Sequence, residues 1–200
     1  MARVKMCGMM RPEDIEIVNE LRPDYIGFVF ASFSKRYVSY ETARKLKEML
    51  DPSIKAVGVF VDENPKIVAS VANEDLIDLI QVHGSEGPGE IERIKAFTTK
   101  TVIQAVKIHT KEDVEIARQS PADGILLDSG MGSGETFNWG LLELIRRPYM
   151  LAGGLTPENV AEAIRRCHPF AVDVSSGIET DGKKDRAKME AFMQVVRQTK

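Results

Sequence analysis

Short apolar runs rich in β-branched residues alternate with charged segments along this 200-residue chain, and the alternation repeats eight times. Within the charged segments the apolar residues recur three or four positions apart, which is the period of an amphipathic helix. Each unit takes about 25 residues, enough for a strand of about 5, a helix of about 11 and two short loops. The sequence therefore predicts eight strand-helix units in one domain that spans residues 1–200.

The positions of these runs set the expected elements. Strands are expected at Val4–Cys7, Tyr25–Phe30, Ala56–Val61, Leu79–His83, Val102–Ile108, Gly124–Asp128, Tyr149–Ala152 and Ala171–Ser175. Helices are expected at about 12–22, 40–50, 65–76, 88–97, 111–119, 139–147, 157–167 and 185–198. Side chains that can cap a first helical turn stand before four of these helices, at Asn64, Thr110, Asn138 and Thr156.

Strands separated by helices must run parallel, and eight such units close most naturally into an α/β fold of the (β/α)8 TIM-barrel type. An open doubly wound sheet is the alternative, and it usually carries a glycine fingerprint after its first strand. Residues 7–11 read Cys-Gly-Met-Met-Arg at that place, which does not match the fingerprint. The sequence thus favours the barrel.

Charge and hydropathy narrow the classes of partner. The 27 basic and 30 acidic side chains give a net charge of −3 and are mixed along the chain, so neither nucleic acid nor an anionic membrane surface is an expected partner. Apolar runs fall far short of the roughly 18 residues that a membrane span needs. Charged residues fill the first twenty positions, where a secretory signal would be apolar. We therefore expect a cytoplasmic protein.

In barrels of this kind the reactive groups lie at the carboxyl ends of the strands. Cys7 ends the first strand, and Lys5 shares its face because side chains two apart on a strand point the same way. A neighbouring cation can stabilise a thiolate, although a buried cysteine can also be a small hydrophobe. Cys167 falls at the other end of the barrel, beyond disulfide reach of about 7 Å. The two cysteines show no metal-ligand spacing, so no metal is expected.

Asp128 ends the sixth strand after an apolar run, at the same rim as Cys7. A carboxyl in partly apolar surroundings has a raised pKa, which suits a general acid, whereas a simple turn residue is the alternative. The following segment contains Gly130, Gly132 and Gly134 but matches neither phosphate-binding fingerprint. We interpret it as a mobile flap.

Glycines after the seventh and eighth strands predict a phosphate site. Gly153 and Gly154 follow the seventh strand, and Ser175, Ser176 and Gly177 follow the eighth. The loops at these two places commonly bind phosphate in barrels, because backbone N–H groups can approach an anion closely there. Ordinary turns would explain one such loop more readily than the pair.

Two kinds of basic side chain also fall at this rim. Arg36 lies in the loop after the second strand, where its guanidinium either faces solvent or forms a fork for a substrate carboxylate. His83 and His109 end the fourth and fifth strands, and a single histidine there is as often structural as catalytic. His168 falls at the opposite end.

Eight ordered blocks along nearly the whole chain resemble one known family, that of phosphoribosylanthranilate isomerase, a cofactor-free enzyme of tryptophan biosynthesis. The blocks are KMCGMMRPED at 5–14, DYIGFVF at 24–30, SKRYVS at 34–39, VGVFVDENP at 57–65, QVHGSE at 81–86, LLDSGMGSGETFNW at 126–139, LAGGLTPENV at 151–160 and VDVSSGIETDGKKD at 172–185. Departures from the usual family pattern are Met9 and Met10, Ser133 and Asn138, none of which is a proposed acid or base.

The resemblance implies an Amadori rearrangement of a small phosphosugar, N-(5-phosphoribosyl)anthranilate, to 1-(2-carboxyphenylamino)-1-deoxyribulose 5-phosphate. By the same resemblance Asp128 protonates the ring oxygen and Cys7 removes the C2′ proton. Arg36 is expected to hold the anthranilate carboxylate, and His83 matches a family position that lines the site. Lys5 is also expected in the substrate site, because it shares a strand face with Cys7.

The resemblance also assigns the phosphate to Gly153, Gly154 and the Ser175-Ser176-Gly177 segment. It implies no cofactor. We expect a monomer or a homodimer. Two alternatives remain. One is a related phosphosugar isomerase such as that of histidine biosynthesis, a family that pairs two aspartates, whereas the first strand here offers Cys7. The other is a barrel that binds a phosphate ligand and catalyses no reaction.

Overall fold

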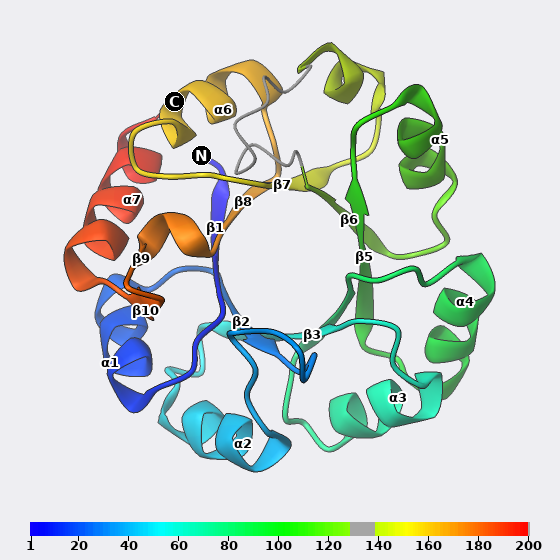
Figure 1. The fold of residues 1–200 in the computed structure, drawn as a ribbon, viewed down its shortest axis with the longest axis horizontal. Helices are drawn as coiled ribbons and strands as arrows, with labels where there is room; N and C mark the ends of the chain where they lie inside the picture. Colours follow the sequence, from blue (N-terminus) through cyan, green and yellow to red (C-terminus); the bar gives the residue numbers. More distant parts are fainter. Residues whose placement is uncertain (129–138, 200) are drawn as a thin grey trace.

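The computed structural model describes residues 1–128 and 139–199, in which eight parallel strands close into a barrel with helices around it (Figure 1). The strands pair in chain order, and the last pairs with the first. The predicted (β/α)8 barrel is confirmed, and the open-sheet alternative is wrong. The strands are β1 Arg3–Cys7, β2 Tyr25–Val29, β3 Lys55–Phe60, β4 Leu79–Val82, β5 Thr101–Lys107, β6 Gly124–Asp128, β7 Tyr149–Ala152 and β8 Ala171–Val174.

The α-helices lie outside the strands and close to their predicted positions. They are α1 Pro12–Leu21, α2 Tyr40–Met49, α3 Pro65–Asn73, α4 Pro88–Phe97, α5 Lys111–Gln119, α6 Val160–Cys167 and α7 Arg186–Gln198. The predicted caps at Asn64 and Thr110 are confirmed, since each side chain accepts a hydrogen bond from a backbone N–H of the first turn. The predicted cap at Asn138 lies outside the described residues.

The α-helix predicted over 139–147 is wrong. This segment instead forms a short 3-10 helix, η2 Trp139–Leu144. Pro148 disfavours helical backbone in the residue before it, and Gly140 weakens a helix near its start. Too few residues remain between them for a stable α-helix.

The helix predicted from residue 157 starts three residues later, at Val160. Asn159, rather than Thr156, is the residue that precedes the helix. Its side-chain oxygen accepts a hydrogen bond from the Thr156 backbone N–H, and its side-chain nitrogen donates to the Gly154 carbonyl. These bonds tie the Asn159 side chain back to residues 154–156, so the turn at 156–159 is closed by a side chain before the first helical residue.

A small hairpin follows β8 where no strand is predicted. The 3-10 helix η3 Ser176–Ile178 leads into β9 Glu179–Thr180 and β10 Lys183–Lys184, which pair antiparallel. Strands of two residues are too short to show an alternating pattern. The Asp-Gly pair at 181–182, typical of tight hairpin turns, is the one sequence signal that could have indicated it.

Three aspartates brace the amino end of the barrel in the same way. Asp24, Asp78 and Asp123 each stand directly before an even-numbered strand, and each accepts a backbone N–H bond from the second residue of the preceding strand, at 2.8 to 2.9 Å. These bonds fix the relative heights of three strand pairs. They thereby fix the heights of the side chains at the carboxyl ends.

The barrel interior is apolar toward the amino ends of the strands and charged toward the carboxyl ends. Tyr25, Leu126 and Met150 belong to an apolar cluster of strand residues. Lys5 and Asp173 are register partners across the β1–β8 seam, and Lys5 Nζ lies 2.9 Å from Asp173 Oδ1. Both side chains are buried, so an ion pair joins the two strands that close the barrel.

Replacing Lys5 with Met is expected to lower the free energy of unfolding by about 3 to 5 kcal/mol, because Asp173 is then buried without its cation. The double variant Lys5→Met/Asp173→Asn removes both charges and should recover part of the loss. Urea unfolding followed by circular dichroism measures both effects. A Lys5→Met protein as stable as the parent would contradict this role of the pair.

Candidate active site

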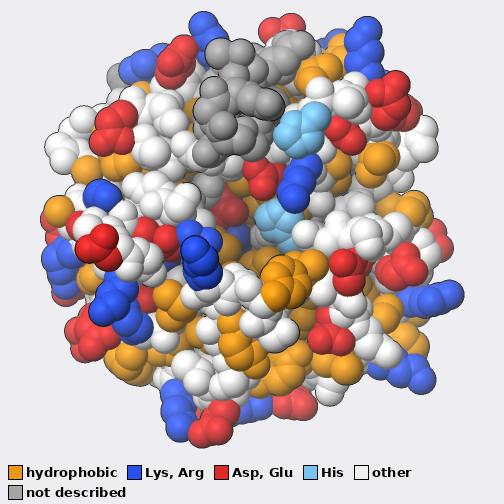
Figure 2. All heavy atoms as spheres, in the orientation of Figure 1, with side chains coloured by type: hydrophobic (Ala, Val, Ile, Leu, Met, Phe, Trp, Pro, Cys, Tyr) orange, Lys and Arg blue, Asp and Glu red, His pale blue; other side chains and the backbone are white. Residues whose placement is uncertain are grey.

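A cavity of about 590 Å³ lies at the carboxyl ends of the strands, a size suited to one small molecule. Figure 2 looks onto this end of the barrel, where charged and histidine side chains gather around a central hollow. Eight of the predicted site residues line the cavity together: Cys7, Arg36, His83, Asp128, Gly153, Gly154, Ser175 and Ser176. The other two do not line it, since Lys5 is fully buried beside Asp173 and Gly177 packs against the loop after β7.

Cys7 ends β1, and its thiol is buried against its register partner Gly27 on β2. Burial raises the pKa of the Cys7 thiol. The cations of Lys5 and Lys184 oppose that rise, and the carboxylate of Asp173 adds to it. The thiol is therefore a weak acid, and the thiolate formed from it is a strong base with two cations close by.

Lys5 stays charged in spite of its burial. Burial acts to lower the pKa of Lys5, but Asp173 and Cys7 hold it above the ordinary lysine value. The ammonium can therefore stabilise negative charge on both of these neighbours.

Asp128 ends β6 and lines the same cavity as Cys7, on a strand that is not a neighbour of β1. His83 Nε2 lies 3.7 Å from Asp128 Oδ2, and His83 Nδ1 lies 3.0 Å from the Gln81 amide nitrogen. The Gln81 oxygen is buried and has no hydrogen-bond partner within residues 1–128 and 139–199. Turning the Gln81 amide lets that oxygen accept a bond from Nδ1–H, which leaves Nε2 as an acceptor toward Asp128.

The loops after β7 and β8 pack directly on each other. A Cβ atom at Gly177 would lie 1.9 Å from the Leu155 carbonyl oxygen, so this approach requires glycine. Gly153 and Gly154 line the cavity together with Ser175 and Ser176. The two loops thus form one wall of the cavity.

Arg36 is held by a carboxylate that no sequence pattern singles out. Its Nε and Nη2 donate to the two oxygens of Glu179, each at 2.7 Å. Lys184 Nζ donates to the same carboxylate at 2.7 Å. Glu179 and Lys184 both come from the β9–β10 hairpin, whose two-residue strands are too short for a pattern to predict the cluster.

Gln81 and Asp173 also line the cavity, as their spacing predicts, because they stand two positions before His83 and Ser175 and share their faces. Phe33 and Lys107 line it too and were outside the prediction.

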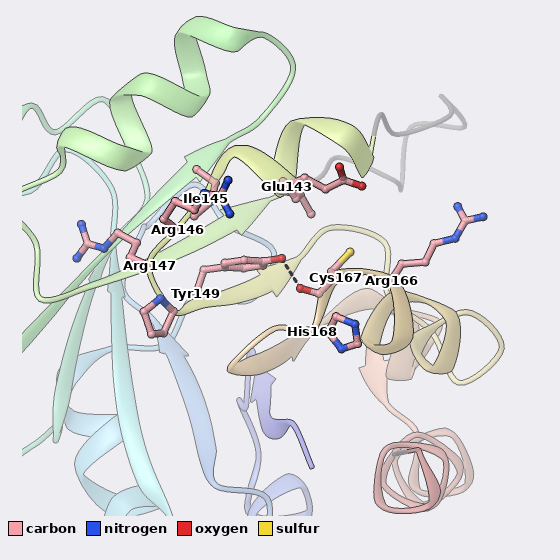
Figure 3. A pocket seen from close by; sticks show the side chains of 10 residues that line it. Glu143, Ile145, Arg146, Arg147, Tyr149, Arg166, Cys167 and His168 are labelled. Carbon is pink, nitrogen blue, oxygen red and sulfur yellow. Dashed lines mark hydrogen bonds between the residues drawn. The ribbon is translucent and has the colours of Figure 1, made fainter.

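The remaining cysteine and histidine candidates lie elsewhere. His109 is exposed and does not line the cavity, and its backbone N–H donates to Asp113 at the start of α5. Cys167 and His168 line a separate hollow near the amino end of β7, where Tyr149 Oη donates to the Cys167 carbonyl (Figure 3). Burial raises the pKa of Cys167 to about 12, so it is a thiol at neutral pH.

The expected flap with Gly130, Gly132 and Gly134 lies outside the described residues, as does Ser133. Within residues 1–128 and 139–199, no group of three or more His, Cys, Asp or Glu side chains is arranged to hold a metal ion. In the same part of the chain, no helix has the length and apolar character needed to cross a membrane.

Comparison with known proteins gives consistent matches over the whole chain. The sequence profile of the family described as N-(5′-phosphoribosyl)anthranilate (PRA) isomerase matches residues 4–195. The N-(5′-phosphoribosyl)anthranilate isomerase of Thermoanaerobacter sp. strain X514 is 45% identical, with 98% of each chain covered. The enzyme of the same name from Clostridium acetobutylicum is 44% identical, with 100% of each chain covered.

Solved structures agree with the sequence matches. Phosphoribosyl anthranilate isomerase from Thermotoga maritima has a TM-score of 0.89 and 40% identity, with 98% of this chain and 99% of that chain covered. A phosphoribosyl anthranilate isomerase in complex with reduced 1-(o-carboxyphenylamino)-1-deoxyribulose 5-phosphate has a TM-score of 0.87 and 39% identity over the same shares.

Replacing Gly177 with Ala is expected to push the loops after β7 and β8 apart, because the new Cβ meets the Leu155 carbonyl oxygen. Binding of inorganic phosphate, measured by calorimetry, should weaken at least about tenfold if these loops form the anion site. Gly89→Ala is the matched control, since a Cβ at Gly89 has nothing within 4 Å. Unchanged phosphate binding in Gly177→Ala would exclude the two loops as the anion site.

Alkylation of Cys7 is expected to need high pH. In a Cys167→Ser variant, reaction with iodoacetamide reports on Cys7 alone, and the thiolate is the reactive form. Because the pKa of Cys7 is raised, the rate should reach its midpoint above the ordinary cysteine pKa of about 8.5. Adding Lys5→Met should move the midpoint further up, and a midpoint below about 8.5 in the parent would contradict the described environment.

Proposed function

Because the chain belongs to the N-(5′-phosphoribosyl)anthranilate isomerase family, we propose that its own Asp128 and Cys7 are the acid and the base of the isomerisation. The protein is an isomerase of tryptophan biosynthesis that converts the aminoaldose N-(5-phosphoribosyl)anthranilate to the corresponding aminoketose. The observation that carries the assignment of residues is the single cavity that Cys7, Asp128, Arg36 and the glycine loops line together.

Asp128 opens the sugar ring. Its carboxyl gives a proton to the ring oxygen while the bond from that oxygen to C1′ breaks, and the lone pair of the anthranilate nitrogen forms the C1′ iminium. His83 Nε2 lies 3.7 Å from Asp128 Oδ2, beside the carboxyl that gives up this proton.

Cys7 then takes the proton from C2′. The adjacent iminium acidifies that carbon, so the electron pair of the C–H bond neutralises the cation and gives an enolamine. Lys5 and Lys184 stabilise the thiolate that performs this step. Loss of the C2′ hydroxyl proton and protonation of C1′ complete the aminoketose, so the product is an isomer of the substrate.

The two anionic ends of the substrate orient it between the acid and the base. We assign the carboxylate to Arg36, whose guanidinium matches a carboxylate in geometry. We assign the phosphate to the wall formed by Gly153, Gly154, Ser175 and Ser176. A relative crystallised with reduced 1-(o-carboxyphenylamino)-1-deoxyribulose 5-phosphate supports a ligand with both anionic groups.

We also propose that the chain acts in the cytoplasm as a monomer or homodimer. A metabolic role supports the first statement, and a relative from Thermotoga maritima that is described as dimeric supports the second.

Cys7→Ser and Asp128→Asn are each expected to lower kcat by about 10² to 10⁴ with little change in KM, because each removes one proton-transfer group. The measurement is the loss of anthranilate fluorescence from freshly prepared phosphoribosylanthranilate.

Cys167→Ser is the matched control for the cysteine change and should keep full activity, since Cys167 lies in the separate hollow at the other end of the barrel. If Cys7→Ser raises KM and leaves kcat unchanged, Cys7 is a binding group and the proposed base is wrong.

A further inference from the structure

One carboxylate, that of Glu179, binds two cations from different parts of the chain. Arg36 comes from the loop after β2, and Lys184 comes from β10. The side chain of Glu179 is 8% exposed, that of Lys184 is 0% exposed and that of Arg36 is 30% exposed. This is a buried cluster at the edge of the cavity, unlike the exposed ion pairs elsewhere on the barrel, which contribute little.

Glu179 is ionised in this cluster. Burial acts to raise the pKa of Glu179, but hydrogen bonds from Arg36 and Lys184 hold it below the ordinary glutamate value. With two cations and one anion, the cluster has a net charge of +1. A second carboxylate therefore still meets a cationic site.

The stem of Arg36 is fixed as well as its head. Gly8, which follows Cys7, has φ +82, and a Cβ there would lie 2.5 Å from Arg36 Cδ. The Arg36 side chain thus crosses the carboxyl end of β1 in direct contact with the backbone. It approaches the cavity beside the proposed base.

Glu179 uses only one edge of the guanidinium, the edge formed by Nε and Nη2. The other edge, formed by Nη1 and the second N–H of Nη2, has no hydrogen bond to any residue in 1–128 or 139–199. Arg36 also lines the cavity. A ligand carboxylate can therefore use the remaining two-donor edge without displacing Glu179.

We propose that Glu179 is a positioning residue for recognition of the substrate carboxylate: it holds one edge of Arg36 so that the other edge faces the cavity. This proposal rests on the assignment of the carboxylate to Arg36. Lys184 donates to the Glu179 carboxylate and also, at 3.0 Å, to the Ser175 carbonyl. Glu179 therefore connects the Arg36 subsite to the loop assigned to phosphate. Glu179 thus helps set the spacing of the two anion subsites.

The test compares two ligands that differ only in the carboxylate. One is reduced 1-(o-carboxyphenylamino)-1-deoxyribulose 5-phosphate, and the other is its phenylamino analogue without the carboxyl group. In Glu179→Gln, Arg36 loses the charged partner that orients it, so the Kd of the carboxylated ligand should rise at least about tenfold. The Kd of the analogue should stay within about threefold of the parent value. Isothermal titration calorimetry measures both.

Glu179→Gln leaves the buried Lys184 without its anion, so the double variant Glu179→Gln/Lys184→Met is measured in parallel as the better-folded form. It should show the same selective loss. Glu74→Gln is the matched control, because Glu74 pairs with Arg44 at 2.8 Å on the exposed surface far from this cluster in the fold. It should leave both Kd values unchanged.

An equal loss for both ligands in the two Glu179 variants, or tighter binding of the carboxylated ligand, would overturn the proposal. The first result would mean general damage, and the second would mean that Glu179 competes with the substrate. The Arg36→Met variant tests separately whether Arg36 binds the substrate carboxylate. If that variant binds both ligands as the parent does, Arg36 is not the carboxylate site, whatever the role of Glu179.

Discussion

Closure of the sheet between β1 and β8 is the constraint on which the site depends. The seam makes Lys5 and Asp173 register partners and pairs them at 2.9 Å in the barrel interior. The next inward-facing position on β1 is Cys7, so the buried ion pair lies directly below the proposed base in the barrel interior. Without the seam, Lys5 would have no buried carboxylate to pair with and no reason to be buried.

Burying charge is costly unless each charge is paired, and here the pairing leaves a surplus that suits the chemistry. Around Cys7 lie three cations, Lys5, Arg36 and Lys184, and two carboxylates, Asp173 and Glu179. Their sum is +1, which a Cys7 thiolate would neutralise. The half-buried Cys167 has a raised pKa of about 12, and a single cation, Arg166, opposes that rise, whereas Lys5 and Lys184 both oppose it at Cys7.

The proposed proton-transfer groups lie at strand ends, whereas the groups assigned to substrate binding lie on loops. The proposed acid and base end β6 and β1, whose heights are fixed by the sheet and by the aspartate braces at the amino end. The groups assigned to the anionic ends of the substrate lie on loops, which can adapt to a ligand while packed contacts such as Gly177 on Leu155 limit their movement. Rigid placement is needed where protons move, because small displacements there are costly in rate.

Local spacing along the chain was enough to predict the barrel and much of the rim. The repeat of a helix, 3.6 residues, and that of a strand, 2 residues, can be read from residues close together in the sequence. They were enough to predict the eight units and the shared face of Lys5 and Cys7. They also predicted that Asp128 lies at the same rim as the glycine loops. The 3-10 helix at Trp139–Leu144 and the start of α6 at Val160 did not, because Pro148 and the Asn159 side chain overrode the helical pattern. The ion pair between Arg36 and Glu179 could not be predicted from the sequence, for a different reason. Glu179 lies 143 residues further along the chain, on a two-residue strand with no period of its own, and only barrel closure brings the two together.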